Sequence, residues 1–279
     1  MNCLILDGLM LKAKILETAK EKIRNENLHL TLAIIQVGDN LASNVYIKNK
    51  IKACEEVGIK VVYRKINPPT DEEEIIRIID YFNQDNTVTG IILQSPLPDN
   101  LDFGRCSSHI LSSKDVDGFT RENIYSLYLN KKGILPCTVK GILCLLREYD
   151  ICLNGANVAI IGRGNIVGKP LALALENADA TVTLCHSKTK NIKDITKNAD
   201  IVIAACGVPH IVTADMVKEN VVVVDVGISK ISEKIVGDVD FDNVKEKAAF
   251  ITPNPGGVGP MTVAMIIDNL IEMGSEQNG

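Results

Sequence analysis

The sequence predicts an α/β protein with two α/β domains around a cleft. Its 279 residues suit two domains of ordinary size better than one. Short apolar segments rich in β-branched residues alternate with helical segments, as in parallel sheets that are covered by helices. The alternation occurs in two series, and the irregular segment 95–119, rich in Pro, Asp, Gly and Ser, follows the first series. The two series therefore predict two separate sheets.

The first series follows an amphipathic helix at 9–25 and has the order strand–helix–strand–helix–strand. The expected elements are a strand at 32–37, a helix at about 43–57, a strand at 59–65, a helix at 70–82 and a strand at 88–93. Thr70, with Glu73 three residues later, has the capping-box pattern that opens a helix. The last strand is almost wholly apolar, as a strand covered on both faces should be. These features indicate one complete α/β domain.

A helix that Thr138 could cap, running to about Tyr149, precedes the second series. The further elements expected are strands at 157–161, 181–185, 201–205, 221–226 and 250–252, a helix to about 177 after the first of them, and a last helix at 262–273. We place the domain boundary near Pro136, with a first domain at 1–136, a second at 137–261, and a C-terminal helix, 262–279, that packs back on the first. Ligands in such folds bind beyond the carboxyl ends of strands. The expected cleft walls are the loops after Val37, Leu93, Ile161, Ala205 and Val226.

The composition argues against several classes of partner and site. With 30 basic and 35 acidic residues the net charge is −5, so we expect no nucleic-acid partner and no membrane partner. The eight cysteines form no C-x-x-C pair, and we interpret them as buried thiols of a reducing compartment. No metal site is expected. Because the N-terminus lacks the basic region of a signal peptide and no apolar run reaches membrane-spanning length, we expect a cytoplasmic protein.

A glycine-rich turn after the strand at 157–161 indicates a dinucleotide site of the Rossmann type. Gly162, Gly164 and Gly168 have the spacing G-x-G-x-x-x-G, which is one residue longer than the usual fingerprint. Glycines there let backbone N–H groups approach a pyrophosphate at the start of a helix. The spacing alone also suits an ordinary turn, but this turn follows an apolar strand and opens a helix.

The next strand, 181–185, predicts which cofactor is bound. NAD sites usually have Asp or Glu at the end of this strand, where it bonds the ribose 2′-hydroxyl. Here His186, Ser187 and Lys188 follow the strand, and there is no acid. Ser187, Lys188 and Arg163 could donate hydrogen bonds to a 2′-phosphate, although the same residues would suit a polar turn. Together with the glycine turn, they favour an NADP-binding domain.

Candidate substrate residues lie in the first domain. On its helix at about 43–57, the residues Tyr46, Lys50, Ala53 and Val57 form one row at helical spacing. A half-buried lysine can exchange protons near neutrality, whereas most helical lysines are simply solvated.

Gln94 follows the apolar third strand, so its amide would face the cleft unless it only ends the strand. Asp115 and Asp117 form an acidic turn that lacks the further ligands a metal needs. A carboxylate aimed into a cleft can bind the amino-pyrimidine edge of a pterin. The segment 253–262 is stiff and permits close backbone approach, so it either wraps a ligand or forms a corner between domains.

Taken together, these segments resemble the bifunctional methylenetetrahydrofolate dehydrogenase/methenyltetrahydrofolate cyclohydrolase family. The resemblance covers nearly the whole chain, from Val37 to Thr262. The segments that carry it are Val37-Gly38-Asp39-Asn40 with Ser43, Tyr46 and Lys50; Gln94-Ser95-Pro96-Leu97-Pro98; Lys114-Asp115-Val116-Asp117-Gly118-Phe119; Pro136-Cys137-Thr138; Gly162-Arg163 with Ile166-Val167-Gly168-Lys169-Pro170; and Pro255-Gly256-Gly257-Val258-Gly259-Pro260-Met261-Thr262. Their order and spacing are too specific for a chance agreement.

The resemblance implies two reactions. The first oxidises 5,10-methylenetetrahydrofolate to 5,10-methenyltetrahydrofolate with NADP⁺, and the second hydrolyses that product to 10-formyltetrahydrofolate. In the family, the residue matching Lys50 is the central catalytic residue, that matching Tyr46 stacks on or orients the folate, and that matching Gln94 modulates the lysine. The residue matching Asp117 holds the pterin ring. The family is typically a homodimer joined through its cofactor domains.

The resemblance assigns roles to further residues of this chain. The residues so assigned are, for catalysis, Lys50, Tyr46, Gln94 and Asp117; for cofactor binding, Gly162, Arg163, Gly164, Ile166, Gly168, Ser187 and Ile228; and for substrate binding, Tyr46, Asp117, Pro255, Gly256, Gly257 and Thr262. Arg163 and Ser187 match residues that contact the 2′-phosphate.

Three positions depart from the family pattern. Gly164 stands where the family often has Ser, so a hydroxyl donor to the cofactor is missing. Val139 replaces a common Pro, and Ser95 replaces a common Leu beside Gln94, which makes that wall more polar. Two other functions stay open: a shikimate-type NADP dehydrogenase and a non-catalytic redox sensor that only binds NADP(H). The first gives no reason for Gln94, and the second leaves Lys50 without a role.

Overall fold

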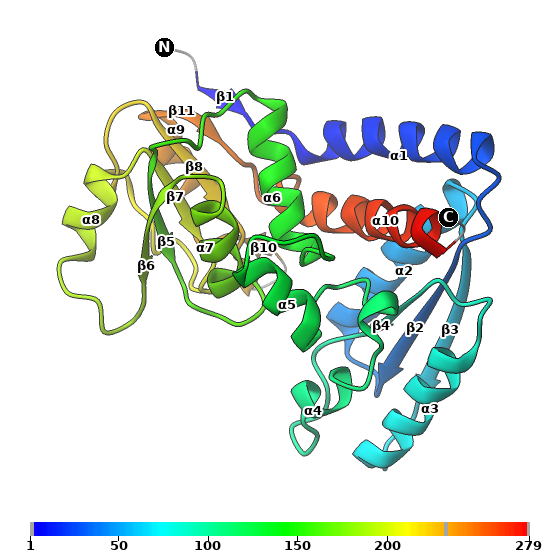
Figure 1. Ribbon diagram of the computed structural model, residues 1–279. Coiled ribbons are helices and arrows are strands. Elements are labelled where there is room, and N and C mark those ends of the chain that lie inside the picture. The colour runs from blue at the N-terminus through cyan, green and yellow to red at the C-terminus, as the bar shows by residue number, and fades with distance from the viewer. Residues whose placement is uncertain (1–2, 232–233, 278–279) are drawn as a thin grey trace. The chain divides into compact units, whose positions relative to one another are not determined.

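The computed structural model describes residues 3–231 and 234–277 of the chain (Figure 1). These residues form two compact units. The six-stranded unit consists of the segment up to Lys12 together with Thr138–Thr262. The three-stranded unit consists of Ala13–Cys137 together with the segment from Val263.

Two long helices contribute to both units. Helix α1 spans Gly8–Asn25 and helix α10 spans Val258–Gln277. Helix α10 begins before the expected start at Thr262, within the segment predicted to be a rigid loop. Pro260 lies in its first turn, where backbone N–H groups have no helical partner, so a proline is tolerated there. Residues 278 and 279 of the expected C-terminal helix lie outside the described residues.

The three-stranded unit has a parallel sheet in the order β3-β2-β4. Its elements are β2 (Thr31–Val37), α2 (Leu41–Glu56), β3 (Lys60–Ile66), α3 (Glu72–Gln84), β4 (Gly90–Leu93), α4 (Phe103–Ser107), a short 3₁₀ helix η1 (Ser112–Lys114) and α5 (Arg121–Tyr128). Every residue of β2 and β4 is buried, as expected for apolar strands covered on both faces. The strand–helix order of the first series is therefore present.

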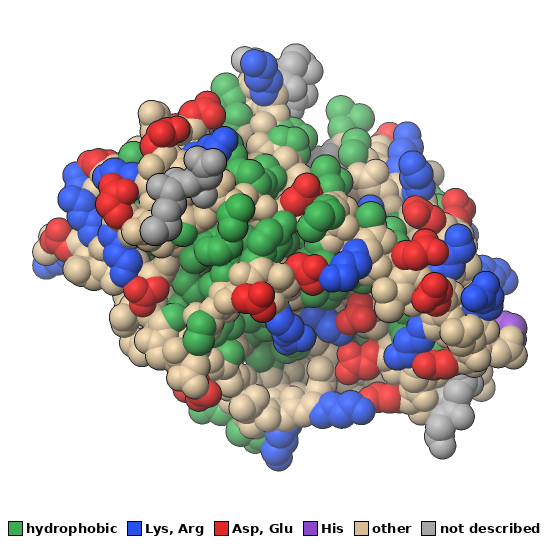
Figure 2. All heavy atoms as spheres, turned by 90° about the horizontal axis from the view of Figure 1, so that it is seen from above, with side chains coloured by type: hydrophobic (Ala, Val, Ile, Leu, Met, Phe, Trp, Pro, Cys, Tyr) green, Lys and Arg blue, Asp and Glu red, His purple; other side chains and the backbone are tan. Residues whose placement is uncertain are grey.

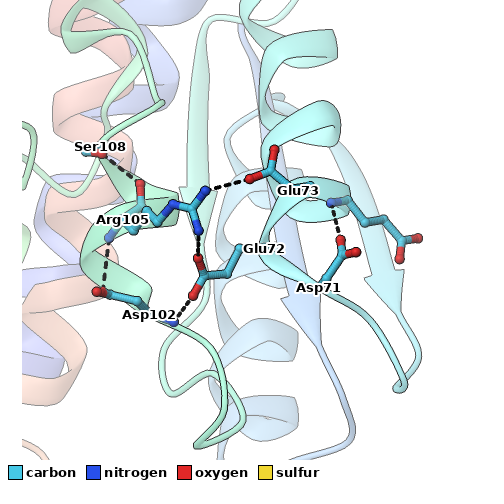
Figure 3. A network of polar contacts seen from close by, with 7 residues as sticks. Asp71, Glu72, Glu73, Asp102, Arg105 and Ser108 are labelled. Carbon is cyan, nitrogen blue, oxygen red and sulfur yellow. Dashed lines mark hydrogen bonds and ion pairs between the residues drawn. The ribbon is translucent and has the colours of Figure 1, made fainter.

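Helix α3 is fixed at its start by polar side chains. Its cap is Asp71, whose Oδ1 accepts from the backbone N–H of Glu74 at 2.8 Å. The capping-box pattern predicted Thr70 instead, but the Thr70 hydroxyl donates to the Glu74 carboxylate at 2.6 Å. Arg105 of α4 pairs with Glu72 and with the neighbouring Glu73, so α4 is tied to the first turn of α3 (Figure 3). Both acids also suit the positive end of the helix dipole.

The six-stranded unit has a parallel sheet in the order β1-β11-β8-β7-β5-β6. Its strands are β1 (Leu4–Ile5), β5 (Asn157–Ile161), β6 (Thr181–Cys185), β7 (Ile201–Ala204), β8 (Val221–Asp225) and β11 (Ala248–Ile251). Its other elements are α6 (Cys137–Glu148), α7 (Gly168–Glu176), α8 (Ile192–Asn198), the 3₁₀ helix η2 (Ala214–Met216), the antiparallel pair β9 (Ser229–Ile231) and β10 (Lys234–Val236), and α9 (Phe241–Lys245).

The strand order locates a switch point in this sheet. After β5 the chain adds β6 on one side and then β7 on the other side of β5. Open α/β sheets bind ligands beyond the carboxyl ends of the strands at such a point. The glycine turn at Gly162 directly follows β5 and so lies at this position.

The N-terminus differs from the expected division of the chain. Strand β1 pairs with β11, with Leu4 opposite Phe250 and Ile5 opposite Ile251. A strand of two residues gives no periodic pattern, which is why the sequence did not predict it. The first residues of the chain therefore extend the six-stranded sheet and do not belong to the other unit.

The surface carries charges of both signs. On the face drawn in Figure 2, basic and acidic side chains are interspersed, which agrees with a net charge of only −5. No helix among the described residues is both long and apolar enough to cross a membrane.

Candidate active site

Helix α2 carries two of the expected catalytic residues. It begins after Asn40, whose Oδ1 accepts a hydrogen bond from the backbone N–H of Ser43 at 3.0 Å. The buried residues of α2 and its C-cap include Ser43, Ile47, Lys50, Ala53, Cys54 and Val57. Lys50 is only 8% exposed, and Tyr46, one turn earlier, is half-buried. The lysine therefore lies on the buried face of the helix and not among its solvated charges.

The Lys50 side chain ends at Gln94. Its Nζ donates to Oε1 of Gln94 at 3.1 Å. Gln94 directly follows β4, and its backbone N–H donates to the carbonyl of Ile35 at 2.8 Å. Its Nε2 donates to the carbonyl of Ser95 at 2.6 Å, and that carbonyl also accepts from Ser43 Oγ at 3.4 Å. The amide is thus oriented with its oxygen toward the lysine, and the sheet brings together two residues that are distant in sequence.

A polar network that the sequence analysis missed holds the start of α2. Gln36 of β2 is 1% exposed, and its Nε2 donates to Oδ1 of Asn44 at 2.8 Å. Asn44 donates to Asp39 at 2.9 Å, and Lys65 of β3 pairs with the same carboxylate oxygen at 2.8 Å. The Tyr63 hydroxyl donates to Oε1 of Gln36. The available signal was Gln36 itself, an amide within an apolar strand.

The two carboxylates of the acidic turn have different surroundings. Asp115 is buried and accepts from the backbone N–H groups of Gly118 and Thr120, at 3.0 and 2.6 Å. It also accepts from Asn123 Nδ2 at 3.0 Å. Burial raises the pKa of the Asp115 carboxyl, and the hydrogen bonds from Thr120 and Asn123 oppose that rise. Both carboxylate oxygens of Asp115 therefore already accept hydrogen bonds that close the turn.

Asp117 is only half-buried, and its carboxylate makes no hydrogen bond with any described residue. It borders a small hollow in the three-stranded unit. The apolar part of the wall includes Ile91, Leu93, Phe103 and Phe119. A carboxylate beside an apolar wall suits a flat ligand with hydrogen-bond donors along one edge. Among the described residues, no group of His, Cys, Asp and Glu side chains could hold a metal ion.

The glycine turn after β5 has the close packing that a dinucleotide site needs. Gly162 has φ +116°, and a Cβ at this position would lie 2.2 Å from the carbonyl oxygen of Ala205. A Cβ at Gly168 would lie 2.1 Å from the carbonyl oxygen of Gly162. A Cβ at Gly164, by contrast, would meet nothing within 4 Å. Gly162 and Gly168 therefore pack against backbone inside the turn. Gly164 and Ile166 are exposed on its outer side, where open space fits a pyrophosphate.

The residues expected at the 2′-phosphate follow two neighbouring strands, β5 and β6, at the same end of the sheet. Ile161 of β5 and Cys185 of β6 are paired in register, and Arg163 and Ser187 each follow two residues later. Both side chains are exposed. The turn after β6 is closed by the Thr189 hydroxyl, which accepts from the backbone N–H of His186 at 2.8 Å. Arg163 supplies a positive charge and Ser187 a neutral hydroxyl donor, and His186-Ser187-Lys188 contains no acid, which fits an anionic group.

The segment 253–257 packs closely within the six-stranded unit. A Cβ at Gly257 would lie 2.7 Å from the carbonyl oxygen of Pro253, and a Cβ at Gly8 would lie 1.8 Å from that of Gly257. Gly257 is therefore covered, whereas Pro255 is exposed and Gly256 is half-buried. The remaining expected residues of this unit are Ile228, which is 50% exposed, and Thr262, whose Oγ1 lies 3.1 Å from that of Thr138.

Comparison with known protein families covers both units. The model of the tetrahydrofolate dehydrogenase/cyclohydrolase catalytic domain matches residues 6–117. The model of the NAD(P)-binding domain of the same family matches residues 136–278. The chain is 48% identical over 273 residues to the bifunctional protein FolD of Campylobacter jejuni serotype O:23/36. This match covers 96% of this chain and 97% of that protein. It is also 48% identical over 271 residues to FolD of Clostridium novyi, with coverage of 96% and 98%.

Solved structures agree with this comparison. The crystal structure of FolD from Campylobacter jejuni has a TM-score of 0.95 at 47% identity and covers 98% of both chains. The Trypanosoma brucei methylenetetrahydrofolate dehydrogenase-cyclohydrolase, solved with NADP and an inhibitor, has a TM-score of 0.94 at 32% identity, with coverage of 99% and 98%. A shikimate 5-dehydrogenase from Thermus thermophilus, at 14% identity and a TM-score of 0.52, shares only the fold. The resemblance in the sequence motifs is confirmed, and the chain belongs to the tetrahydrofolate dehydrogenase/cyclohydrolase family.

Proposed function

We propose that this chain oxidises 5,10-methylenetetrahydrofolate to 5,10-methenyltetrahydrofolate with NADP⁺ and hydrolyses the product to 10-formyltetrahydrofolate. The observation that carries the proposal is the buried Lys50 amine at 3.1 Å from Gln94 Oε1, in a domain of the family's catalytic type. Oxidation alone would not require a proton-exchanging group beside the substrate. Hydrolysis does require one, so this pair argues for both activities.

For the oxidation, the residues of this chain mainly orient the reactants. NADP⁺ supplies the hydride acceptor, and the two folate nitrogens stabilise the cation that forms on the substrate. We assign the pyrophosphate to the turn of Gly162, Gly164 and Gly168, and the 2′-phosphate to Arg163 and Ser187. A phosphate there gains charge-assisted hydrogen bonds, whereas an acid would repel it. This arrangement favours NADP⁺ over NAD⁺.

For the hydrolysis, Lys50 is the group that moves the proton. Water attacks the methenyl carbon and loses one proton to the amine. The bond from that carbon to N5 then breaks as the amine returns this proton to N5, and the hydroxyl proton leaves to solvent as the formyl C=O forms. Gln94 holds the amine in place. Burial raises the pKa of Tyr46, so its hydroxyl remains protonated at neutral pH and can donate a hydrogen bond while the ring packs on the folate. Asp117 accepts hydrogen bonds from the amino-pyrimidine edge of the pterin.

The test follows the absorbance of methenyltetrahydrofolate. Purified protein with methylenetetrahydrofolate should form the chromophore with NADP⁺ and far less with NAD⁺. Added methenyltetrahydrofolate should then lose its absorbance faster than in buffer alone. Turnover of shikimate, or binding of NADP(H) without any folate turnover, would overturn the proposal.

We also propose a cytoplasmic homodimer that is joined through its cofactor domains and has neither nucleic acid nor membrane as a partner. The support is the family resemblance together with a net charge of −5. Light scattering of the purified chain should give twice the mass of 30.4 kDa. A monomeric mass at assay concentration would contradict the dimer.

A further inference from the structure

Two buried carboxylates lie at the carboxyl ends of the strands in the six-stranded unit. Asp225 ends β8 and is 3% exposed, and Asp238 follows β10 and is 0% exposed. Neither forms an ion pair with any described residue. A buried charge without a cationic partner is costly unless hydrogen bonds compensate for the lost water. Such a pair needs an explanation that the reaction steps above do not give.

Both carboxylates accept hydrogen bonds from several backbone N–H groups. Asp225 accepts from the N–H groups of Gly227, Asp238 and Val239, at 3.1, 2.9 and 3.1 Å. Asp238 in turn accepts from the N–H groups of Cys206 and Gly207 through Oδ2, at 2.7 and 2.9 Å. Asp225 therefore fixes the segment that carries Asp238, and Asp238 fixes the loop that follows β7.

Two glycines leave the room that these carboxylates occupy. A Cβ at Gly227 would lie 2.0 Å from Oδ1 of Asp238, and a Cβ at Gly237 would lie 1.7 Å from Oδ2 of Asp225. Asn254 Nδ2 donates to the carbonyl of Gly227 at 2.5 Å, which ties the same loop from a third side. The loops after β7 and β8 are thus held against one another at fixed positions.

Oδ1 of Asp238 is buried and has no hydrogen-bond partner among the described residues. An unsatisfied buried acceptor lowers stability. A residue chosen only for stability would not leave this oxygen unpaired. An unpaired Oδ1 fits a carboxylate whose role is to position the loop bound at Oδ2.

The loops that Asp238 holds lie on one side of the switch point. The 2′-phosphate residues Arg163 and Ser187 follow β5 and β6, so the adenine half of the cofactor belongs to that side of the sheet. The nicotinamide half then extends over β7 and β8. The loops there present Val208 and Ile228, which are 46% and 50% exposed.

We infer that Asp238, supported by Asp225, is a positioning residue for the nicotinamide half of the cofactor. The inference rests on the NADP⁺ site proposed above. Asp238 holds Gly207 by a hydrogen bond and packs against Gly227, whose N–H is held by Asp225, so that Val208 and Ile228 form a fixed apolar wall for the nicotinamide ring. The adenine half depends on other loops and does not need this carboxylate.

The test compares two ligands by titration calorimetry: NADP⁺ and 2′,5′-ADP, which is the adenine half alone. Asp238→Ala should weaken NADP⁺ binding at least about tenfold, or 1.4 kcal/mol, and change 2′,5′-ADP binding less than about twofold. Asp238→Asn keeps an acceptor oxygen and should give a smaller loss of the same kind. Asp215→Asn, an exposed acid of the same unit that pairs with Lys193, is the matched control and should change neither ligand.

Each outcome decides the inference. A variant that binds 2′,5′-ADP normally is folded, so its loss of NADP⁺ binding would be specific to the nicotinamide half. Equal weakening of both ligands in Asp238→Ala and Asp238→Asn would show a general structural role and overturn the inference, as would unchanged NADP⁺ binding. A wild-type chain that binds neither ligand would instead overturn the cofactor site itself, and this inference with it.

Discussion

Replacement of Lys50 by methionine separates the two proposed activities. Methionine keeps the length of the side chain but removes the amine that meets Gln94 Oε1 at 3.1 Å. Hydrolysis needs a group that accepts and returns a proton, whereas hydride transfer does not. Lys50→Met should therefore abolish hydrolysis of methenyltetrahydrofolate and leave measurable dehydrogenase activity.

The magnitudes follow from the surroundings of the amine. A positioned acid–base group contributes about 10²–10⁴-fold to a rate, so hydrolysis should fall by at least about 100-fold. The amide oxygen of Gln94 loses its donor, which costs about 1–3 kcal/mol of stability. The apolar methionine side chain suits the buried face that position 50 shares with Ile47 and Cys54, which offsets part of that cost. The variant should accordingly fold.

Hydrolysis is measured as the loss of methenyltetrahydrofolate absorbance above the uncatalysed rate in the same buffer. Lys48→Met is the matched control, because Lys48 lies on the same helix and is exposed. A folded Lys50→Met protein that hydrolyses at the wild-type rate would remove Lys50 from the mechanism. Loss of both activities with intact folate binding would mean that Lys50 also positions the carbon for hydride transfer.

Three further outcomes are expected. Arg163→Ala should weaken NADP⁺ by about 10- to 150-fold, the effect of a charge-assisted hydrogen bond of about 1.5–3 kcal/mol; equal loss of NAD⁺ in calorimetry would contradict its role at the 2′-phosphate. Asp117→Ala should weaken folate binding and lower both activities with NADP⁺ affinity nearly unchanged, and an unaltered folate affinity would make Asp117 a turn residue only. Burial raises the pKa of Asp225 from 3.8 to about 6, so its contribution to folding is fully present below about pH 4, and about 3 kcal/mol is lost as the pH rises through 6. Asp225→Asn should flatten the urea-unfolding free energy between about pH 4 and 7, and parallel profiles for variant and wild type would refute that role.

Features of the fold with a local physical cause could be predicted from the sequence. The glycine turn is one, because the need for Gly162 and Gly168 arises from backbone contacts that follow one strand. The row around Lys50 is another, since helical spacing alone places it beside Ala53 and Val57 on a buried face. Apolar strands such as β4 were predictable for the same reason: burial on both faces leaves little choice of side chain.

Other features depend on partners that are remote in the chain. Strand β1 has two residues and exists only because β11 lies beside it. The cap of α3 shows a different limit, because Thr70 and Asp71 both suit the cap position and only the path of the chain selects Asp71. The burial of Asp238 could not be predicted either. Its hydrogen-bond donors are the backbone N–H groups of Cys206 and Gly207, which precede it by more than thirty residues.

The orientation of Gln94 determines what Lys50 can do. Because Gln94 Nε2 donates one N–H to the Ser95 carbonyl at 2.6 Å, the amide is turned with its oxygen toward the lysine. An amide oxygen is an acceptor, so the amine must direct an N–H bond at it, both when charged and when neutral. The lone pair of a neutral Lys50 amine therefore points away from Gln94. When the amine is charged, the N–H group that can release a proton is likewise one that does not face Gln94. If the Gln94 amide were turned the other way, its NH2 group would face Lys50 and donate to the lone pair of the neutral amine. That lone pair would then not be available to a water molecule. In the proposed mechanism, Gln94 would fix the direction of proton exchange. The carbonyl of Ser95, which accepts from Gln94 Nε2 and from Ser43 Oγ, orients the Gln94 amide.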